Sequence, residues 1–110
     1  MSKAHFVHWR YIAVKMDGPK LSRRELNKAV MALGRKRGLP EGRWPSLTRY
    51  EYPHAIIRVQ HMDAWACRQW LAAGLAVKDG ATPATLALET LSSSGTIKTL
   101  TERLGILLKR

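Results

Sequence analysis

The stretch "HWRYIAVKM", residues 8–16, begins the pattern that decides the fold. Ile12, Val14 and Met16 fall on one face of an extended chain. The other face would carry Trp9, Tyr11, Ala13 and Lys15. This alternation, with its aromatic and β-branched residues, predicts a β-strand.

In the next segment, "LSRRELNKAVMALGRKRG" (residues 21–38), the spacing of the apolar residues becomes that of a helix. Ser22 and Glu25 have the spacing of a capping box, which predicts a helix that ends near Gly38. Along one side of this helix, apolar residues recur at helical spacing: Leu26, Ala29, Val30 and Leu33. The opposite side is predicted to be cationic, with Arg24, Lys28 and Arg35.

The rest of the chain extends this pattern to a β-α-β-β-α-β-α order. The predicted elements are strands 46–52 and 55–60, a helix over 62–75, a strand over 85–91 and a helix from about residue 95. Pro53 cannot donate to a ladder and is predicted in the turn between the two middle strands. Asp63 is predicted to cap the second helix, and residues 77–84 are predicted as a turn region.

The first six elements match the split βαβ plan of ferredoxin-like and RRM-like domains. We therefore predict an α+β fold with a four-stranded antiparallel sheet, two helices on one face, and an additional C-terminal helix. The 110 residues suit a single domain over residues 1–110.

The charge of the chain is its most informative bulk property. Nineteen Lys and Arg face eight Asp and Glu, for a net charge of +11 and a pI near 10.6. Such an excess favours a polyanionic partner, with nucleic acid ahead of an anionic membrane surface. The longest apolar run, residues 70–77, is too short to span a bilayer. A single cysteine and no visible signal peptide favour a cytoplasmic location.

The sequence offers no grouped catalytic residues. The four histidines, His5, His8, His54 and His61, lack the helical i, i+4 spacing of a metal site, and no cysteine pairs with them. The acidic residues are scattered, and no phosphate-binding glycine loop is present. We predict no intrinsic catalysis, no metal site and no bound cofactor.

Nucleic-acid contacts are predicted from clusters of cations. One cluster belongs to the first helix and the following loop: Arg23, Arg24, Lys28, Arg35, Lys36, Arg37 and Arg43. A second lies near the C-terminus: Lys98, Arg103, Lys109 and Arg110. Base stacking on the sheet is weakly supported, because Trp9 and Tyr11 have no aromatic counterpart in strand 55–60. Phosphate and shape recognition fits better.

The segment "SSSGTIK", residues 92–98, permits two interpretations. A helix that starts near Gly95 presents free backbone N–H groups, which together with Ser94, Thr96 and Lys98 would suit an RNA phosphate. Ordinary capping of that helix by Ser94 explains the same residues. Local chemistry leaves both open.

The predicted second helix is apolar nearly all round, which indicates that more than one side is covered. Tryptophan is a frequent anchor of protein interfaces. Met62, Trp65 and Trp70 are therefore predicted to contact a protein partner.

Three short motifs in order resemble protein component 2 of archaeal ribonuclease P, a family shared with small subunits of eukaryotic ribonuclease P and MRP. They are "RYIAVKM" (10–16), "YEYPHAIIRVQ" (50–60) and "SSGTIKTL" (93–100), within a resemblance that covers roughly residues 9–104. The sharpest element is Ser94-Gly95-Thr96-Ile97-Lys98. The family commonly has an aromatic-Gly pair where this chain has Leu33-Gly34.

The resemblance implies a non-catalytic RNA-binding subunit. Ribonuclease P removes the 5′ leader of precursor tRNA, and its RNA catalyses the reaction with Mg²⁺. Proteins of this family bind and support the catalytic RNA domain, paired with the TIM-barrel-like protein component 3. A two-plus-two assembly with that partner implies a homodimer contact. Two other hypotheses are a stand-alone nucleic-acid-binding or ribosome-associated module and, last, a small enzyme acting on a phosphorylated metabolite.

Overall fold

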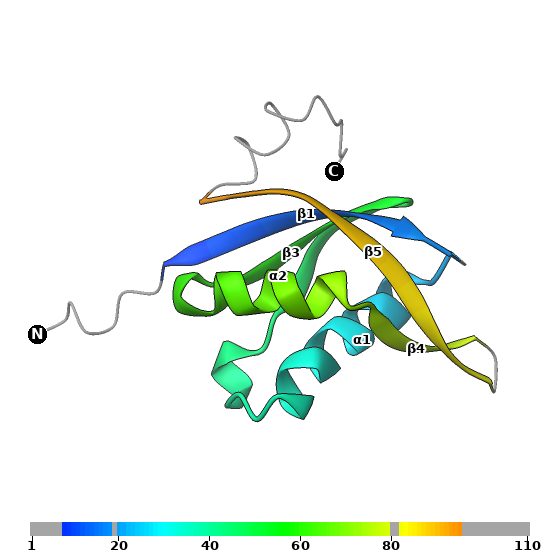
Figure 1. Cartoon of the computed structure of the whole chain (residues 1–110), viewed down its shortest axis with the longest axis horizontal. Coiled ribbons are helices and arrows are strands. Elements are labelled where there is room, and N and C mark those ends of the chain that lie inside the picture. Colours follow the sequence, from blue (N-terminus) through cyan, green and yellow to red (C-terminus); the bar gives the residue numbers. More distant parts are fainter. Residues whose placement is uncertain (1–7, 19, 80–81, 96–110) are drawn as a thin grey trace, which may run out of the picture.

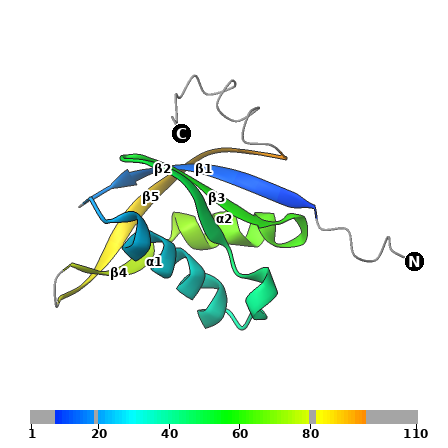
Figure 2. The same ribbon diagram turned by 180° about the vertical axis from the view of Figure 1, so that it is seen from behind.

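The computed structural model describes residues 8–18, 20–79 and 82–95. They form an α+β fold in which two helices lie on one side of an antiparallel sheet, and both views show this arrangement (Figures 1 and 2). No helix in these ranges is long and apolar enough to cross a membrane. The predicted C-terminal helix lies outside the described residues.

The sheet has five strands in the order β2-β3-β1-β5-β4. The strands are β1 (Trp9–Asp17), β2 (Ser46–Glu51), β3 (His54–Gln60), β4 (Leu75–Asp79) and β5 (Thr82–Ser94). The helices are α1 (Arg23–Lys36) and α2 (Ala64–Ala72), with short 3₁₀ turns η2 (Glu41–Arg43) and η3 (His61–Asp63). All neighbouring strands pair antiparallel. The order β2-β3-β1-β5 is compatible with the predicted ferredoxin-like plan.

The prediction of four strands is wrong, because β4 adds a fifth at the edge beside β5. The predicted helix over 62–75 is too long: α2 ends at Ala72, and Gly74 follows with a φ of +102°. That left-handed conformation breaks the helix. Leu75 and Val77 then alternate into the core as a strand. Part of the predicted turn region at 77–84 is thus the hairpin of β4 and β5.

The last strand is also longer than predicted. Ser92, Ser93 and Ser94 continue β5 and pair with Ala13, Ile12 and Tyr11 of β1, respectively. A guanidinium nitrogen of Arg68 on α2 donates to the Ser93 hydroxyl over 3.4 Å. The central neighbour β1 supplies the backbone partners that hold these serines extended, and this pairing overrides their local turn preference.

The helix-covered side of the sheet, here called the inner face, contains the main core. The predicted capping box of Ser22 and Glu25 starts α1, which places Leu26 and Val30 against the sheet. From α2, Cys67 and Leu71 are fully buried. The sheet contributes Ile12, Val14, Met16, Ala55, Ile57 and Val59. The predicted alternation of β1 is therefore confirmed.

The opposite side of the sheet, here called the outer face, has a smaller apolar cluster. It joins Ala13 and Ile56 with the part-buried Tyr11 and Leu91. Directly opposed residues of antiparallel strands share a face. Tyr11 lies opposite Arg58 of β3, and Arg49 of β2 lies opposite Ile56. The outer face thus combines a small apolar centre with aromatic and cationic residues.

Candidate nucleic-acid interface

Helix α1 presents the predicted cations on its solvent side. Its first turn begins with Arg23 and Arg24, and its last turn ends with Arg35 and Lys36; these four and Lys28 are exposed. None of the five forms an ion pair with another described residue. Arg23 donates to the Thr48 carbonyl oxygen over 3.1 Å, which ties the helix start to β2. Unneutralised cations along one helix form an electrostatic surface suited to phosphates.

Arg37 follows α1 and has a contact within the protein. Its guanidinium carbon lies 5.3 Å from the ring centroid of Trp70, a cation–π geometry. Trp70 is part-buried and packs against the main core. The contact joins the end of α1 to α2. Trp70 therefore has a structural role, whether or not it also contacts a partner protein.

Arg43 forms a bidentate ion pair with Asp63. Its Nη2 lies 2.6 Å from Oδ1, and its Nε lies 3.0 Å from Oδ2. The hydrogen bond from Arg43 to Asp63 raises the pKa of the guanidinium. Asp63 occupies the predicted N-cap position of α2, but its side chain makes no capping hydrogen bond. The capping function predicted for this carboxylate is wrong, because Arg43 binds it instead.

The structure places Ser94 at the end of β5. Its residue is buried, and its backbone pairs with Tyr11. Gly95 is exposed beyond the end of β5. The other predicted contacts in this region, Thr96, Lys98, Arg103, Lys109 and Arg110, lie outside the described residues. The capping and phosphate-binding interpretations of this corner both stay predictions.

Two of the three predicted interface residues are prominent on the surface. Met62 is 69% exposed and Trp65 is 75% exposed, at the start of α2. Trp70, in contrast, is part-buried against the core. A large exposed apolar pair of this kind favours a protein contact. The prediction of a partner at this end of α2 stays a prediction.

Burial raises the pKa of two groups, Cys67 and Tyr50. Desolvation raises the pKa of the Cys67 thiol to about 12, which makes it unreactive at neutral pH. Desolvation also raises the pKa of Tyr50, whose hydroxyl donates to the Leu21 carbonyl oxygen over 2.6 Å. Across the described ranges, His, Cys, Asp and Glu form no group of three or more that could hold a metal ion.

The sequence prediction missed a set of cations that belongs to the sheet. Arg10, Lys15, Arg49 and Arg58 lie on β1, β2 and β3 and were not selected as contacts. Their alternation with apolar residues was visible in the sequence. Their grouping was not, because it depends on which residues of distant strands are paired.

Comparisons with known proteins show a similarity of fold to one solved structure and no match by sequence. No protein-family model matches the sequence, and no curated protein matches it significantly. The structure is similar to a chain in the cryo-EM structure of yeast ribonuclease MRP, with a TM-score of 0.58 and 17% sequence identity. The match covers 91% of this chain and 93% of that chain. At this identity the likeness concerns the fold alone.

Proposed function

We propose that the protein is an RNA-binding subunit of a ribonuclease P- or MRP-type ribonucleoprotein. The observation that carries this proposal is a net charge of +11 on a fold shared with a chain of yeast ribonuclease MRP. Phosphate contacts by Lys and Arg release counterions and provide most of the affinity of such proteins for RNA. The unpaired cations of α1 suit that function.

The finer assignment is protein component 2 of an archaeal ribonuclease P, acting in the cytoplasm in removal of the 5′ leader from precursor tRNA. The three motifs described above support it. In this proposal the RNA, with Mg²⁺, supplies catalysis, and the protein binds and supports the catalytic RNA domain. The protein itself holds no cofactor.

The proposed protein partner is the TIM-barrel-like protein component 3, in an assembly that pairs two copies of each subunit. The exposed Met62 and Trp65 are the proposed contact, because a large exposed apolar pair is uncommon on a small monomer. Trp70 would contribute by holding α2 in place through Arg37.

Reconstitution tests the function. The chain and its proposed partner are added to a ribonuclease P RNA, and cleavage of precursor tRNA is measured at low Mg²⁺ concentration. We expect the proteins to restore cleavage that the RNA alone loses, because their cations replace Mg²⁺ in screening the phosphates. A matched reaction with protein component 3 alone is the control. Equal cleavage with and without this chain would refute the proposal.

A further inference from the structure

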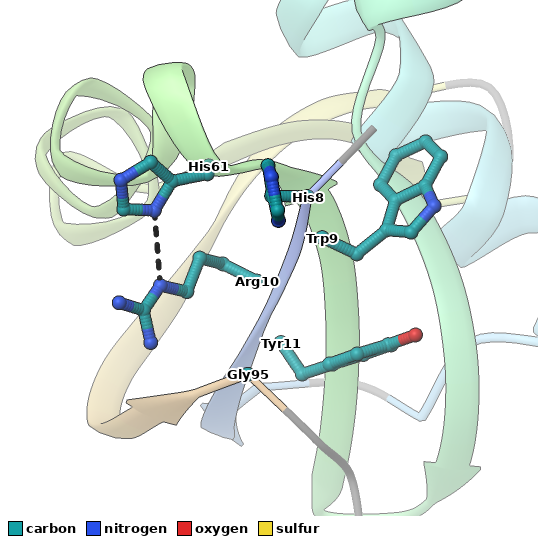
Figure 3. Close-up of a pocket in the computed structure, with 6 residues that line it drawn as sticks. All are labelled: His8, Trp9, Arg10, Tyr11, His61 and Gly95. Carbon is teal, nitrogen blue, oxygen red and sulfur yellow. Dashed lines mark hydrogen bonds between the residues drawn. The ribbon is translucent and has the colours of Figure 1, made fainter. Parts of the chain in front are cut away.

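A pocket of about 600 Å³ lies where β1 begins, and it is open to solvent. Figure 3 shows its lining residues: His8, Trp9, Arg10, Tyr11, His61 and Gly95. The Nε of Arg10 donates to Nδ1 of His61 over 3.2 Å, which fixes the guanidinium beside the 3₁₀ turn η3. Trp9 and Tyr11 point to the other side of the strand, toward the outer face (Figure 3).

The outer face beside this pocket carries three flat groups on its two central strands. Tyr11 on β1 lies directly opposite Arg58 on β3. The Arg58 guanidinium carbon lies 4.2 Å from the ring centroid of Trp9, so the guanidinium stacks on the indole. We call these three residues the stacking platform. Unpaired RNA bases stack on aromatic rings and on guanidinium planes alike.

The Arg58 side chain contacts the Trp9 ring and makes no hydrogen bond to another residue that the structure describes. Its Nε is buried and has no hydrogen-bond partner among the described residues. The guanidinium provides further N–H donors to phosphate or base oxygens.

The surroundings of the stacking platform are cationic. Arg49 lies opposite Ile56 on the next strand, and Lys15 lies two residues beyond Ala13 on the same face of β1. Arg10 lines the pocket and points to the opposite side of β1, toward His61, so it does not belong to this face. Carboxylates are also present on this face: Glu89 lies opposite Lys15, and Glu51 lies opposite His54, which is the β3 neighbour of Lys15. Cations around flat side chains are the arrangement that binds single-stranded nucleic acid.

We propose that the stacking platform binds unpaired nucleotides of RNA. One base stacks on Tyr11 and a neighbouring base on the Arg58 guanidinium, while Arg49 and Lys15, on the same face, bind the flanking phosphates. The platform would read an unpaired segment, in addition to the phosphates contacted by α1. This inference rests on the proposed function, because it names the kind of RNA that the subunit would hold.

The test compares two probes on the intact chain: fluorescein-labelled octaadenylate RNA and an abasic sugar-phosphate strand of equal length. Stacking predicts that the RNA binds at least about fivefold more tightly for each stacked base, since the abasic strand has no bases. Tyr11→Ala should remove most of this difference, and Tyr11→Phe should retain it. Tyr52→Ala removes a tyrosine at the far hairpin, 39% exposed, and serves as the matched control.

A second measurement needs no variant. Photocrosslinking of 4-thiouridine octamers to the wild-type chain, mapped by mass spectrometry, should label peptides of β1 and β3. Equal affinity for the two probes, an unchanged preference in a folded Tyr11→Ala variant, or crosslinks confined to α1 would each overturn the inference. Binding to ribonuclease P RNA is measured in parallel. If that binding persists, only the stacking platform is refuted; if it is absent too, the proposed function fails.

Discussion

The two faces of the sheet use neighbouring residues for opposite purposes. Along β3, Ala55, Ile57 and Val59 enter the inner core, and they alternate with Ile56 and Arg58 of the outer face. The inner face excludes water and is closed by two helices. Among the residues that the structure describes, the outer face has a small apolar cluster, with aromatic rings and cations around it. One strand thus supplies both the fold and the proposed binding surface.

The difference shows where sequence changes should act. Inner-face residues are expected to affect unfolding, because their burial provides the main hydrophobic stabilisation. Outer-face residues are expected to affect RNA affinity with smaller effects on stability.

The largest expected effect concerns the reactivity of the Cys67 thiol, which is buried in the folded chain and exposed in the unfolded chain. Because burial raises its pKa to about 12, little thiolate exists at pH 8 in the folded chain. Against an unfolded value near 8.5, reaction with a disulfide reagent should be slower by about a hundredfold or more. Stopped-flow labelling with and without urea measures this, and equal rates would show that the inner face is not sealed.

A pair of neighbouring variants separates the two faces. Ile57→Ala should lower the free energy of unfolding by about 2–5 kcal/mol, because it leaves a cavity in the main core. Arg58→Ala should cost less than about 1 kcal/mol and should weaken binding to octaadenylate. Urea denaturation gives the stabilities. A larger loss of stability for Arg58→Ala than for Ile57→Ala would contradict the comparison.

Substitution of Gly34 tests how closely α1 packs against Trp44 and Pro45, which follow η2. A β-carbon at Gly34 would lie 2.8 Å from Cδ of Pro45 and 3.0 Å from Cδ1 of Trp44. Gly34→Ala should therefore destabilise the protein by about 1–3 kcal/mol. Gly42→Ala, where nothing lies within 4 Å, is the matched control. Thermal unfolding of the two variants gives the answer, and equal midpoints would refute this packing.

The smallest expected effect distinguishes two arginines outside the sheet. Arg24 on α1 has no ion pair with a described residue, whereas Arg43 is paired with Asp63. If Arg24 contacts a phosphate, Arg24→Ala should reduce the slope of log affinity against log salt by about 0.7–0.9. Arg43→Ala should change that slope less. RNA titrations at four salt concentrations measure both slopes. A larger change for Arg43→Ala than for Arg24→Ala would indicate that Arg43, and not Arg24, contacts a phosphate.

Local patterns predicted the parts of the fold that local chemistry controls. The alternation in β1 and the capping box of α1 depend on residues a few positions apart, and both are confirmed. The edge strand β4 was missed because it has only five residues and its apolar residues Leu75 and Val77 directly follow a helix. Gly74 was the available signal for the helix end.

The candidate site depended more on long-range pairing. The facing of Tyr11 and Arg58 follows from the register of β1 on β3, which neither segment reveals alone. The pair of Arg43 with Asp63 likewise joins two turns that are 20 residues apart. The cations of α1, in contrast, could be predicted from helical spacing in one segment.

Native purification tests directly whether this chain is an RNA-binding subunit of a ribonucleoprotein. The tagged chain is isolated from its own cells at low salt, the bound RNA is sequenced, and cleavage of precursor tRNA is assayed in the same fraction. We expect enrichment of one structured ribonuclease P- or MRP-type RNA, which is lost as the salt concentration is raised. A fraction with neither that RNA nor cleavage activity would contradict it.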